Sequence, residues 1–272
     1  MFEYLHILQC PACGASANFV CAMDGRDGHE PSGLNGSLTC KTCGQEYSIK
    51  NGVIDFLREN HLSSMDRAWQ KKLLLHEKWW REERPTAARA GAAANRWMAS
   101  RRLIENYFNL DAVDTGSHGL LLDVGCGDGR RRGNFFRKKY LGIDPLLLCN
   151  SYPFPFIRGV AEQLPFAGDS FDVVTAVESI DHFADPARSV QEMTRCLAPG
   201  GVLFVFAVDG SAHGPAYSRR QARYSVSEDE VHMRDYSVED LTRLLEGRFE
   251  KLDVDKEDGY VAAWGWKKIR SR

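Results

Sequence analysis

The sequence has no strong excess of either charge and no long apolar run, and these two absences exclude several classes of protein. Its 35 lysine and arginine residues stand against 37 aspartate and glutamate residues, a net charge of -2 at pH 7. No global positive field is therefore available for sequence-independent phosphate binding, which excludes a histone-like protein. No segment reaches the roughly 18 apolar residues that a bilayer span needs, and no basic stretch followed by an apolar run opens the chain. We therefore expect a cytoplasmic protein that does not enter a membrane.

The composition is typical of a folded domain rather than of a disordered or disulfide-rich chain. The 272 residues are 43% hydrophobic and 26% charged, with a mean hydropathy of -0.38, which is ordinary for a globular protein. This length allows one large domain or two modest ones with a buried core. Four of the eight cysteines form two Cys-x-x-Cys pairs near the N-terminus, and this spacing favours metal ligation over disulfides.

The two cysteine pairs predict a structural zinc site. Cys10 and Cys13 form the first pair, Cys40 and Cys43 form the second, and a glycine follows each pair. The glycine lets the backbone turn so that its amides face the thiolates, and four thiolates fill the tetrahedral coordination that zinc prefers. Because no position is left for water, we expect the zinc to stabilise the fold rather than to catalyse.

Residues 1–58, which contain both pairs, are expected to form a small domain. Cys21 and His29 lie between the pairs and could each replace one ligand, but we expect the four paired cysteines to bind the metal. The closing stretch CGQEYSIKNGVIDFL resembles the short zinc-ribbon proteins that activate tRNA and rRNA methyltransferases, and the resemblance covers residues 4–57. It implies a zinc ribbon that accompanies a methyltransferase.

Residues 59–112 are expected to form a helical linker. The leucines at 73–75 and the tryptophans Trp79 and Trp80 lie among charged residues at helical spacing, and Pro85 should break the helix. A second, alanine-rich helical stretch follows. Two roles stay open for these helices, which either cover the sheet and join the domains or form a lid over a substrate site.

The pattern of residues 113–272 indicates an α/β domain. Helical segments separate the short apolar runs GLLLDV, YLGID, FIRGV, FDVVTAV and GVLFVFAV. Continuous apolar strands of this kind form a mainly parallel sheet with both faces covered, and the ligand lies at the carboxyl ends of the strands. The stretches FEKLDVDKED and GYVAAWGWKKI are expected to close the sheet as an antiparallel pair, after a helix capped by Ser237 and Asp240.

A glycine-rich loop and an acidic residue indicate the chemistry of that ligand. The first strand ends at Asp123, and Gly125, Gly127 and Gly129 follow, which permit a tight turn that a ligand can approach closely. Asp144 ends the next strand, 21 residues after Asp123, where a carboxylate can accept hydrogen bonds from both hydroxyls of a ribose. Carboxylates around the loop repel a pyrophosphate and suit an ammonium or a sulfonium.

The ordered motifs LLDVGCGDGR, YLGIDP, GVAEQLPFAGDSFDVV and LAPGG resemble the class I S-adenosylmethionine (SAM)-dependent methyltransferases. The similarity is closest to the small-molecule branch that includes the ubiquinone and menaquinone biosynthesis enzymes. It implies a seven-stranded Rossmann-like fold and SAM as cofactor. The residues it implies around SAM are Asp123, Gly125, Cys126, Gly127 and Val177 at the methionine portion, Asp144 at the ribose, and Pro145, Leu146, Ala161 and Glu162 at the adenine. One departure is Val160, where relatives carry an aspartate that binds the adenine amino group.

The catalytic residues are less clearly marked. Methyl transfer is an in-line displacement, so the protein mainly aligns the acceptor with the donor and excludes water. An acceptor hydroxyl or amine also needs a base that takes its proton. The candidates are Glu178 and His182 after the fourth strand of the domain, and His213 and His232 in the long segment after Asp209, which could act as a lid.

We therefore expect a zinc ribbon, a helical linker and a methyltransferase domain that methylates an oxygen, nitrogen or carbon atom of a small-molecule metabolite. An rRNA or tRNA base methyltransferase is the alternative. The ribbon and the basic run at 130–132 favour it, whereas the four basic and seven acidic residues of segment 1–60 oppose it. A third hypothesis is a non-catalytic subunit that binds the cofactor and docks a partner through the ribbon. The sequence does not define the acceptor, the methylated atom or the oligomeric state.

Overall fold

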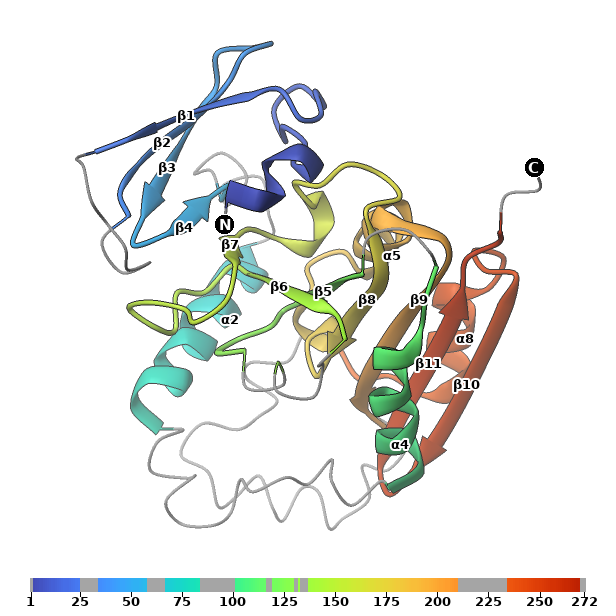
Figure 1. Cartoon of the computed structure of the whole chain (residues 1–272). Helices are drawn as coiled ribbons and strands as arrows, with labels where there is room; N and C mark the ends of the chain where they lie inside the picture. Colours follow the sequence, from blue (N-terminus) through green and yellow to red (C-terminus); the bar gives the residue numbers. More distant parts are fainter. Residues whose placement is uncertain are drawn as a thin grey trace.

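One mixed β-sheet runs through the molecule (Figure 1). The computed structural model describes residues 2–24, 34–57, 67–83, 101–115, 119–129, 132, 137–209 and 234–269. Within these residues the sheet has 11 strands in the order β1-β2-β3-β4-β7-β6-β5-β8-β9-β11-β10. Its first four strands come from the cysteine-rich N-terminal segment, and the other seven come from the α/β segment.

The N-terminal segment is an antiparallel meander that follows a 3-10 turn at Phe2–Ile7. In β3, buried residues alternate with exposed ones, and Tyr47 and Ile49 point to the core, as expected for a sheet with one face in water. The strands are β1 at Phe19–Met23, β2 at Gly36–Cys40, β3 at Glu46–Lys50 and β4 at Val53–Asp55.

The α/β segment contributes the remaining strands in the order β7-β6-β5-β8-β9-β11-β10, of which the first five are parallel. β11 lies antiparallel to both of its neighbours, so the predicted closing pair is present. The apolar runs expected to form buried strands do so, because helices cover both faces. These strands are β5 at Leu120–Val124, β6 at Lys139–Asp144, β7 at Phe156–Arg158, β8 at Phe171–Val177, β9 at Leu197–Val208, β10 at Lys251–Glu257 and β11 at Tyr260–Trp266.

The sequence predicts a seven-stranded fold with a small N-terminal zinc ribbon, and the sheet seen in the described residues is longer because the N-terminal meander joins it. β4 pairs in parallel with β7, with Ile54 opposite Ile157, and the carboxylate of Asp55 forms an ion pair with Arg158 at 2.9 Å. The N-terminal meander, β1–β4, therefore covers the edge of β7 and extends the sheet to 11 strands. An open edge of this kind carries unpaired backbone groups that favour such pairing, but the sequence of β7 does not show which strand will supply the partner.

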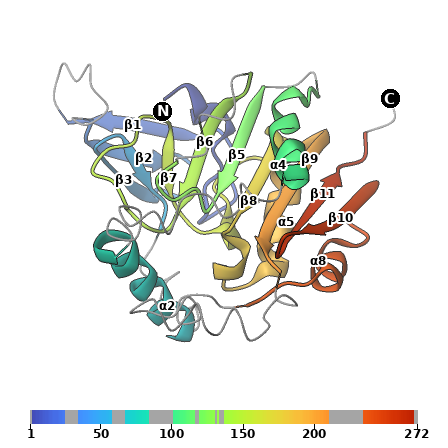
Figure 2. The same cartoon turned by 90° about the horizontal axis from the view of Figure 1, so that it is seen from below.

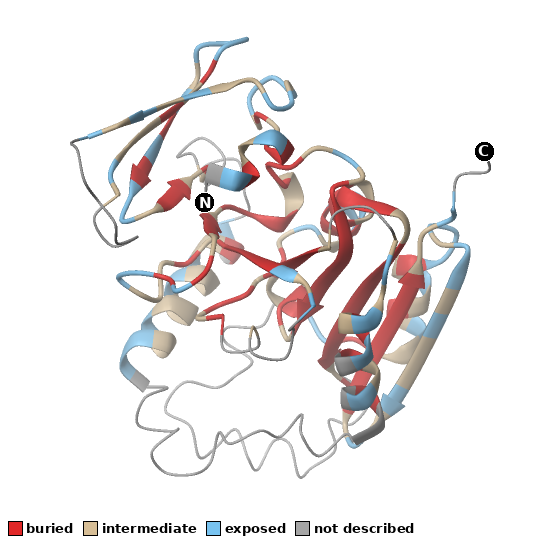
Figure 3. Cartoon of the chain, viewed as in Figure 1, coloured by how far each residue is buried: buried red, intermediate tan, exposed pale blue. Residues whose placement is uncertain are grey.

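The helices cover the two faces of the sheet unequally (Figure 2). α5 at Pro186–Cys196 and α8 at Val238–Leu245 bury their apolar sides against one face, and α4 at Arg101–Asn109 packs on the other. Adjacent residues such as Val173 and Val174 join different cores because they point to opposite faces. Figure 3 shows the buried residues concentrated along the central strands.

The helix starts follow local signals in the sequence. Ser237 caps α8 by accepting a hydrogen bond from the Asp240 amide at 3.1 Å, and the Asp240 carboxylate accepts one from the Ser237 amide at 3.0 Å. This reciprocal arrangement is the predicted capping box. Asp185 caps α5, and Pro186 occupies a first-turn position, where the missing amide hydrogen costs nothing.

The linker helices are two separate elements. α2 at Arg67–Lys78 continues into a π-helical turn at Trp79–Glu83, and α4 follows at residue 101. Residues 84–100, with the predicted break at Pro85, lie outside the described residues. No helix in the described part of the chain has the length and apolar character to cross a membrane.

Candidate functional site

The glycine-rich loop after β5 has a backbone that only glycine adopts without strain. Gly125 has a φ of +75° and Gly127 a φ of +59°, values in the left-handed region. A Cβ atom at Gly125 would lie 2.4 Å from the Cβ of Ser179, which follows β8. The loop and the end of β8 are thus in direct contact, at the carboxyl edge of the parallel strands.

Asp144 lies under this loop at the end of β6. Its carboxylate accepts hydrogen bonds from the backbone amides of Gly127 at 2.9 Å and Leu146 at 2.8 Å. Burial raises the pKa of Asp144 to about 6 even though these amides lower it, and the nearby carboxylates of Asp123 and Asp128 add to the rise. The sequence predicts Asp144 at a ribose. The structure puts Asp144 beside the glycine loop, and its contact with a ribose remains a prediction.

Asp123 lies deeper than the loop. Its carboxylate accepts hydrogen bonds from the hydroxyls of Tyr140 at 2.6 Å and Thr175 at 2.8 Å, so it joins β5 to the strands on either side. Burial raises the pKa of Tyr140 well above its ordinary value, and the charge of Asp123 adds to the effect. A contact between Asp123 and the cofactor remains a prediction.

Several other predicted cofactor residues have structural partners of their own. The Glu162 carboxylate accepts hydrogen bonds from the amides of Ala184 at 2.8 Å and Asp185 at 3.1 Å, and burial raises its pKa. Burial also raises the pKa of the Cys126 thiol well above its usual value, in keeping with a packing role. Pro145 is half-buried, and Leu146, Ala161 and Val177 are buried near the strand ends.

The segment that follows β8 is tightly held. Glu178 adopts a φ of +50°, unusual for a residue with a side chain, and Ser179 donates its hydroxyl to the Val124 carbonyl at 2.8 Å. Beyond them, His182 lies at the end of a 3-10 turn at Ile180–His182. Arg234 donates to the carbonyls of Phe183 and Ala184 at 2.6 and 2.9 Å, and Tyr236 donates to that of Ile180 at 3.4 Å.

α2 brings to this segment residues that the sequence analysis did not assign to the site. The indole of Trp69 donates to the His182 carbonyl at 2.8 Å, and the His76 ring stacks on the His182 ring with centroids 4.2 Å apart. The Trp80 indole donates to Nε2 of His76 at 3.0 Å, and its ring lies 3.3 Å from where a Cβ of Gly127 would be. Helical periodicity indicated an amphipathic helix here, but it carried no information about what the helix would contact.

Two of the four predicted catalytic residues cannot be placed. His213 and His232 lie outside the described residues, as do most of the basic residues at 130–136. Glu178 and His182 are both in the segment after β8, and His182 contacts α2 as described. Their catalytic roles remain predictions.

The four paired cysteines form one cluster in the N-terminal meander. All four sulfurs lie within 4.8 Å of one another, with Cys10 and Cys43 sulfurs 3.8 Å apart and Cys13 and Cys40 sulfurs 3.7 Å apart. A tetrahedron with metal–sulfur bonds of about 2.3 Å has edges of about 3.8 Å, so the spacing fits a tetrahedral metal ion. The glycines that follow each pair have positive φ values, as the sequence predicted.

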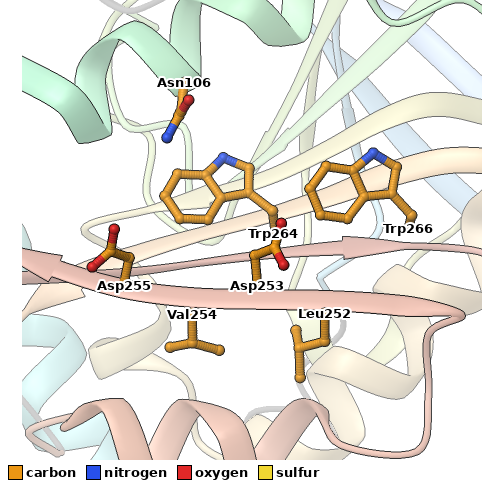
Figure 4. Close-up of a pocket in the computed structure, with 7 residues that line it drawn as sticks. All are labelled: Asn106, Leu252, Asp253, Val254, Asp255, Trp264 and Trp266. Atoms are coloured by element: carbon orange, nitrogen blue, oxygen red, sulfur yellow. The ribbon is translucent and has the colours of Figure 1, made fainter.

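A separate cleft of about 530 Å³ lies between α4 and the strands β10 and β11 (Figure 4). Asn106, Asp253, Asp255, Trp264 and Trp266 line it together with two aliphatic residues of β10. None of the residues predicted from the sequence to bind the cofactor or to catalyse is among them. β10 is also the strand at the far end of the sheet from the ribbon, so this cleft is distinct from the site under the glycine loop.

Comparison with known proteins finds a family match over a range that includes Asp123 and Asp144. Residues 122–205 match the family described as Methyltransferase domain. The demethylmenaquinone methyltransferase of Chlorobaculum parvum is 32% identical over 38% of this chain and 49% of that protein. The tRNA U34 carboxymethyltransferase of Campylobacter curvus is 32% identical over 38% of this chain and 37% of that protein.

A solved structure has a similar fold. The plantazolicin methyltransferase BamL, solved with S-adenosylhomocysteine (SAH) and a desmethyl analogue, has a TM-score of 0.50 and 13% identity, over 74% of this chain and 97% of that one. At this identity the likeness shows the fold alone. The chain spans about half the length, or less, of the curated relatives it matches. These comparisons show that residues 122–205 are similar to a methyltransferase domain.

Proposed function

We propose that this protein is a SAM-dependent methyltransferase with a small-molecule acceptor. The observation that carries the proposal is the buried carboxylate of Asp144 beside a glycine loop of left-handed backbone, within the segment that matches the methyltransferase domain. A ribose with two free hydroxyls is the ligand that such a carboxylate suits.

The residues around the loop fit the charge of SAM. Asp123, Asp128 and Asp144 lie close enough for their charges to interact, and they favour a ligand with positive charge over one with a pyrophosphate. The residues that would hold SAM are the glycine loop at its methionine portion and Asp144 at its ribose. When bound, SAM supplies an electrophilic methyl group on a sulfonium ion.

The protein's own part in the reaction is to orient the acceptor and to take its proton. His182 and Glu178 stand after β8, next to the glycine loop through the contact between Ser179 and Gly125. An imidazole is suited to accept a proton near neutral pH. α2 covers this edge of the sheet and reduces the access of water, which favours an in-line displacement.

A small acceptor is preferred to RNA because the chain has no excess of basic residues that would bind a phosphate chain. The chain is slightly acidic, and segment 1–60 holds more acidic than basic residues, whereas RNA binding draws on basic patches with aromatic side chains. Both kinds of acceptor occur among the names of the relatives. The experiment therefore has to include both.

The test is SAH formation from SAM when purified protein is incubated with a metabolite extract or, separately, with total RNA. We expect SAH only with the metabolite extract, and no SAH with the variant Asp144→Ala. SAH formed with RNA and lost at high salt would replace the small-molecule proposal by the RNA one. SAH bound tightly but formed with neither acceptor pool would favour a non-catalytic subunit.

We also propose that Cys10, Cys13, Cys40 and Cys43 bind a structural zinc ion. The spacing of the four sulfurs and the presence of only thiolate donors support this choice of metal. Metal analysis of protein purified without chelator should give one zinc per chain, and Cys13→Ser should lower that ratio. A metal content near zero, in protein that is folded, would refute the site.

A further inference from the structure

Two side chains of α2, those of Trp69 and His76, contact the segment around His182, although the two segments are about a hundred residues apart in the chain. The Trp69 indole donates to the His182 carbonyl, and Trp69 itself is buried, with 4% of its surface exposed. The ring of His76 is nearly parallel to that of His182, with an angle of 19° between their planes. α2 thus contacts both the backbone and the imidazole of His182.

The bond from Trp80 defines where the proton of His76 sits. An indole N–H can only donate a hydrogen bond, and it donates to Nε2 of His76 at 3.0 Å. Nε2 must then carry a lone pair, so the proton of the neutral His76 ring is on Nδ1. Protonating His76 on Nε2 would break this bond, because the Nε2–H of His76 and the indole N–H of Trp80 would then be two donors facing each other.

Because the rings of His76 and His182 are stacked, only one of them can carry a positive charge without a large electrostatic cost. Two imidazolium ions at a centroid distance of 4.2 Å would repel strongly at this short range. Since Trp80 holds His76 neutral, the proton goes to His182, and the neutral ring of His76 then lies against the face of the imidazolium, a favourable arrangement.

The charged groups on the surrounding elements are compatible with a cationic His182. Glu178 and Asp181 precede His182 in the segment after β8, where Glu178 is half-buried and Asp181 is buried. On α2, the Glu77 carboxylate pairs with Arg81 at 3.0 Å. Arg234 is the cation from the neighbouring segment, and its guanidinium is engaged by backbone carbonyls.

The π-helical turn that continues α2 also reaches the donor side of the site. Trp80, which orders His76, lies against Gly127 of the glycine loop, and Arg81 donates to the Leu147 carbonyl at 2.6 Å. α2 and the π-helical turn that follows it therefore connect the loop that would hold the donor with the histidine that would face the acceptor.

We infer that His76 is a positioning residue for His182. Its ring holds the His182 imidazole in place by stacking. Because Trp80 keeps His76 neutral, His182 is the ring that accepts the proton of the acceptor. The inference rests on the proposed function. It also narrows the acceptor to a group that loses a proton when methylated, such as a hydroxyl or an amine. In that step the acceptor atom bonds to the methyl carbon, the sulfur keeps the electron pair of the broken bond, and the proton passes to His182.

The first test is the tautomer of His76, followed by ¹H–¹⁵N NMR of the zinc-loaded protein between about pH 5 and about pH 8. We expect His76 to stay neutral with its proton on Nδ1 while His182 titrates. Trp80→Phe removes the donor and keeps an aromatic ring, so His76 should gain the Nε2–H tautomer and titrate. Trp79→Phe is the matched control, because the Trp79 ring lies 6.1 Å from His76 and the same substitution leaves the Trp80 bond intact.

The second test separates stacking from mere folding. His76→Gln removes the ring, and we expect the proton affinity of His182 to fall about threefold, or about half a pH unit, because the imidazolium loses its stacked partner. His76→Phe restores a stacked ring without a proton site and should restore most of that affinity. Melting curves of each variant report whether the fold is intact.

Two outcomes would overturn the inference. One is a wild-type His76 with its proton on Nε2 or one that titrates together with His182. The other is an identical His76 tautomer in Trp80→Phe and Trp79→Phe. Titration of the same samples with SAH tests the proposed function separately. Protein that shows the expected tautomer but binds no SAH would refute the methyltransferase and leave the pairing of the two histidines in place.

Discussion

Replacing Gly125 by alanine should destabilise the protein through two separable effects. The first is backbone strain, because a φ of +75° costs a residue with a Cβ about 1–2 kcal/mol. The second is a clash, because the new Cβ would lie 2.4 Å from the Cβ of Ser179, and overpacking of this kind costs about 1–3 kcal/mol. We therefore expect the free energy of unfolding to fall by about 2–5 kcal/mol in total.

The chain provides a matched control for the strain alone. Gly247 also has a φ of +75°, but no atom lies within 4 Å of the position that its Cβ would take. Gly247→Ala should therefore cost only about 1–2 kcal/mol. Both variants can be measured by urea unfolding, in which a change of midpoint at constant slope reports stability.

A double variant isolates the contact with Ser179. Ser179→Gly removes the atom that the new Cβ would meet, so Gly125→Ala should cost less in that background than in the wild type, with a coupling of about 1–3 kcal/mol. Equal losses for Gly125→Ala and Gly247→Ala, together with strict additivity in the double variant, would refute the close contact between the glycine loop and the end of β8.

Three further predictions concern the site, the metal cluster and one helix. We propose that Asp144 binds the ribose as a carboxylate, and burial raises its pKa to about 6. The Kd for SAH should therefore be constant above about pH 7 and weaken about tenfold per unit below about pH 5. A flat calorimetric profile down to that pH would contradict this. Chelating the zinc should lower the Tm of the whole chain in one transition, because the ribbon shares the main core, and a separate early transition in calorimetry would count against a shared core. Ser237→Ala should cost about 1 kcal/mol in urea unfolding through loss of the α8 cap, whereas no change would show that the cap is unimportant.

The sequence predicted those elements that depend on local patterns. Buried strands such as β8 follow from continuous apolar residues, the start of α8 follows from Ser237 and Asp240, and the cysteine cluster follows from two short spacings. Each of these signals is contained in a few consecutive residues or matches the spacing of a known motif. Local chemistry was therefore sufficient to predict them.

The features that escaped prediction depend on contacts between distant segments. The pairing of β4 with β7 joins residues about a hundred positions apart, and neither strand carries a signal for the other. The stacking of His76 on His182 depends on the rotation of α2 over the sheet, which periodicity alone does not set. Asp123 accepts hydrogen bonds from Tyr140 and Thr175 on the neighbouring strands, partners that the sequence did not indicate, and its contact with the cofactor stays a prediction.

The central proposal, that the glycine loop and Asp144 together bind SAM, is tested most directly by isothermal titration calorimetry with SAH at neutral pH. We predict binding of one SAH per chain to the zinc-loaded protein. Asp144→Ala should weaken that binding by more than about 100-fold, because two hydrogen bonds to a charged group are lost. Absence of heat with the wild-type protein, or an unchanged Kd in the variant, would contradict the proposal.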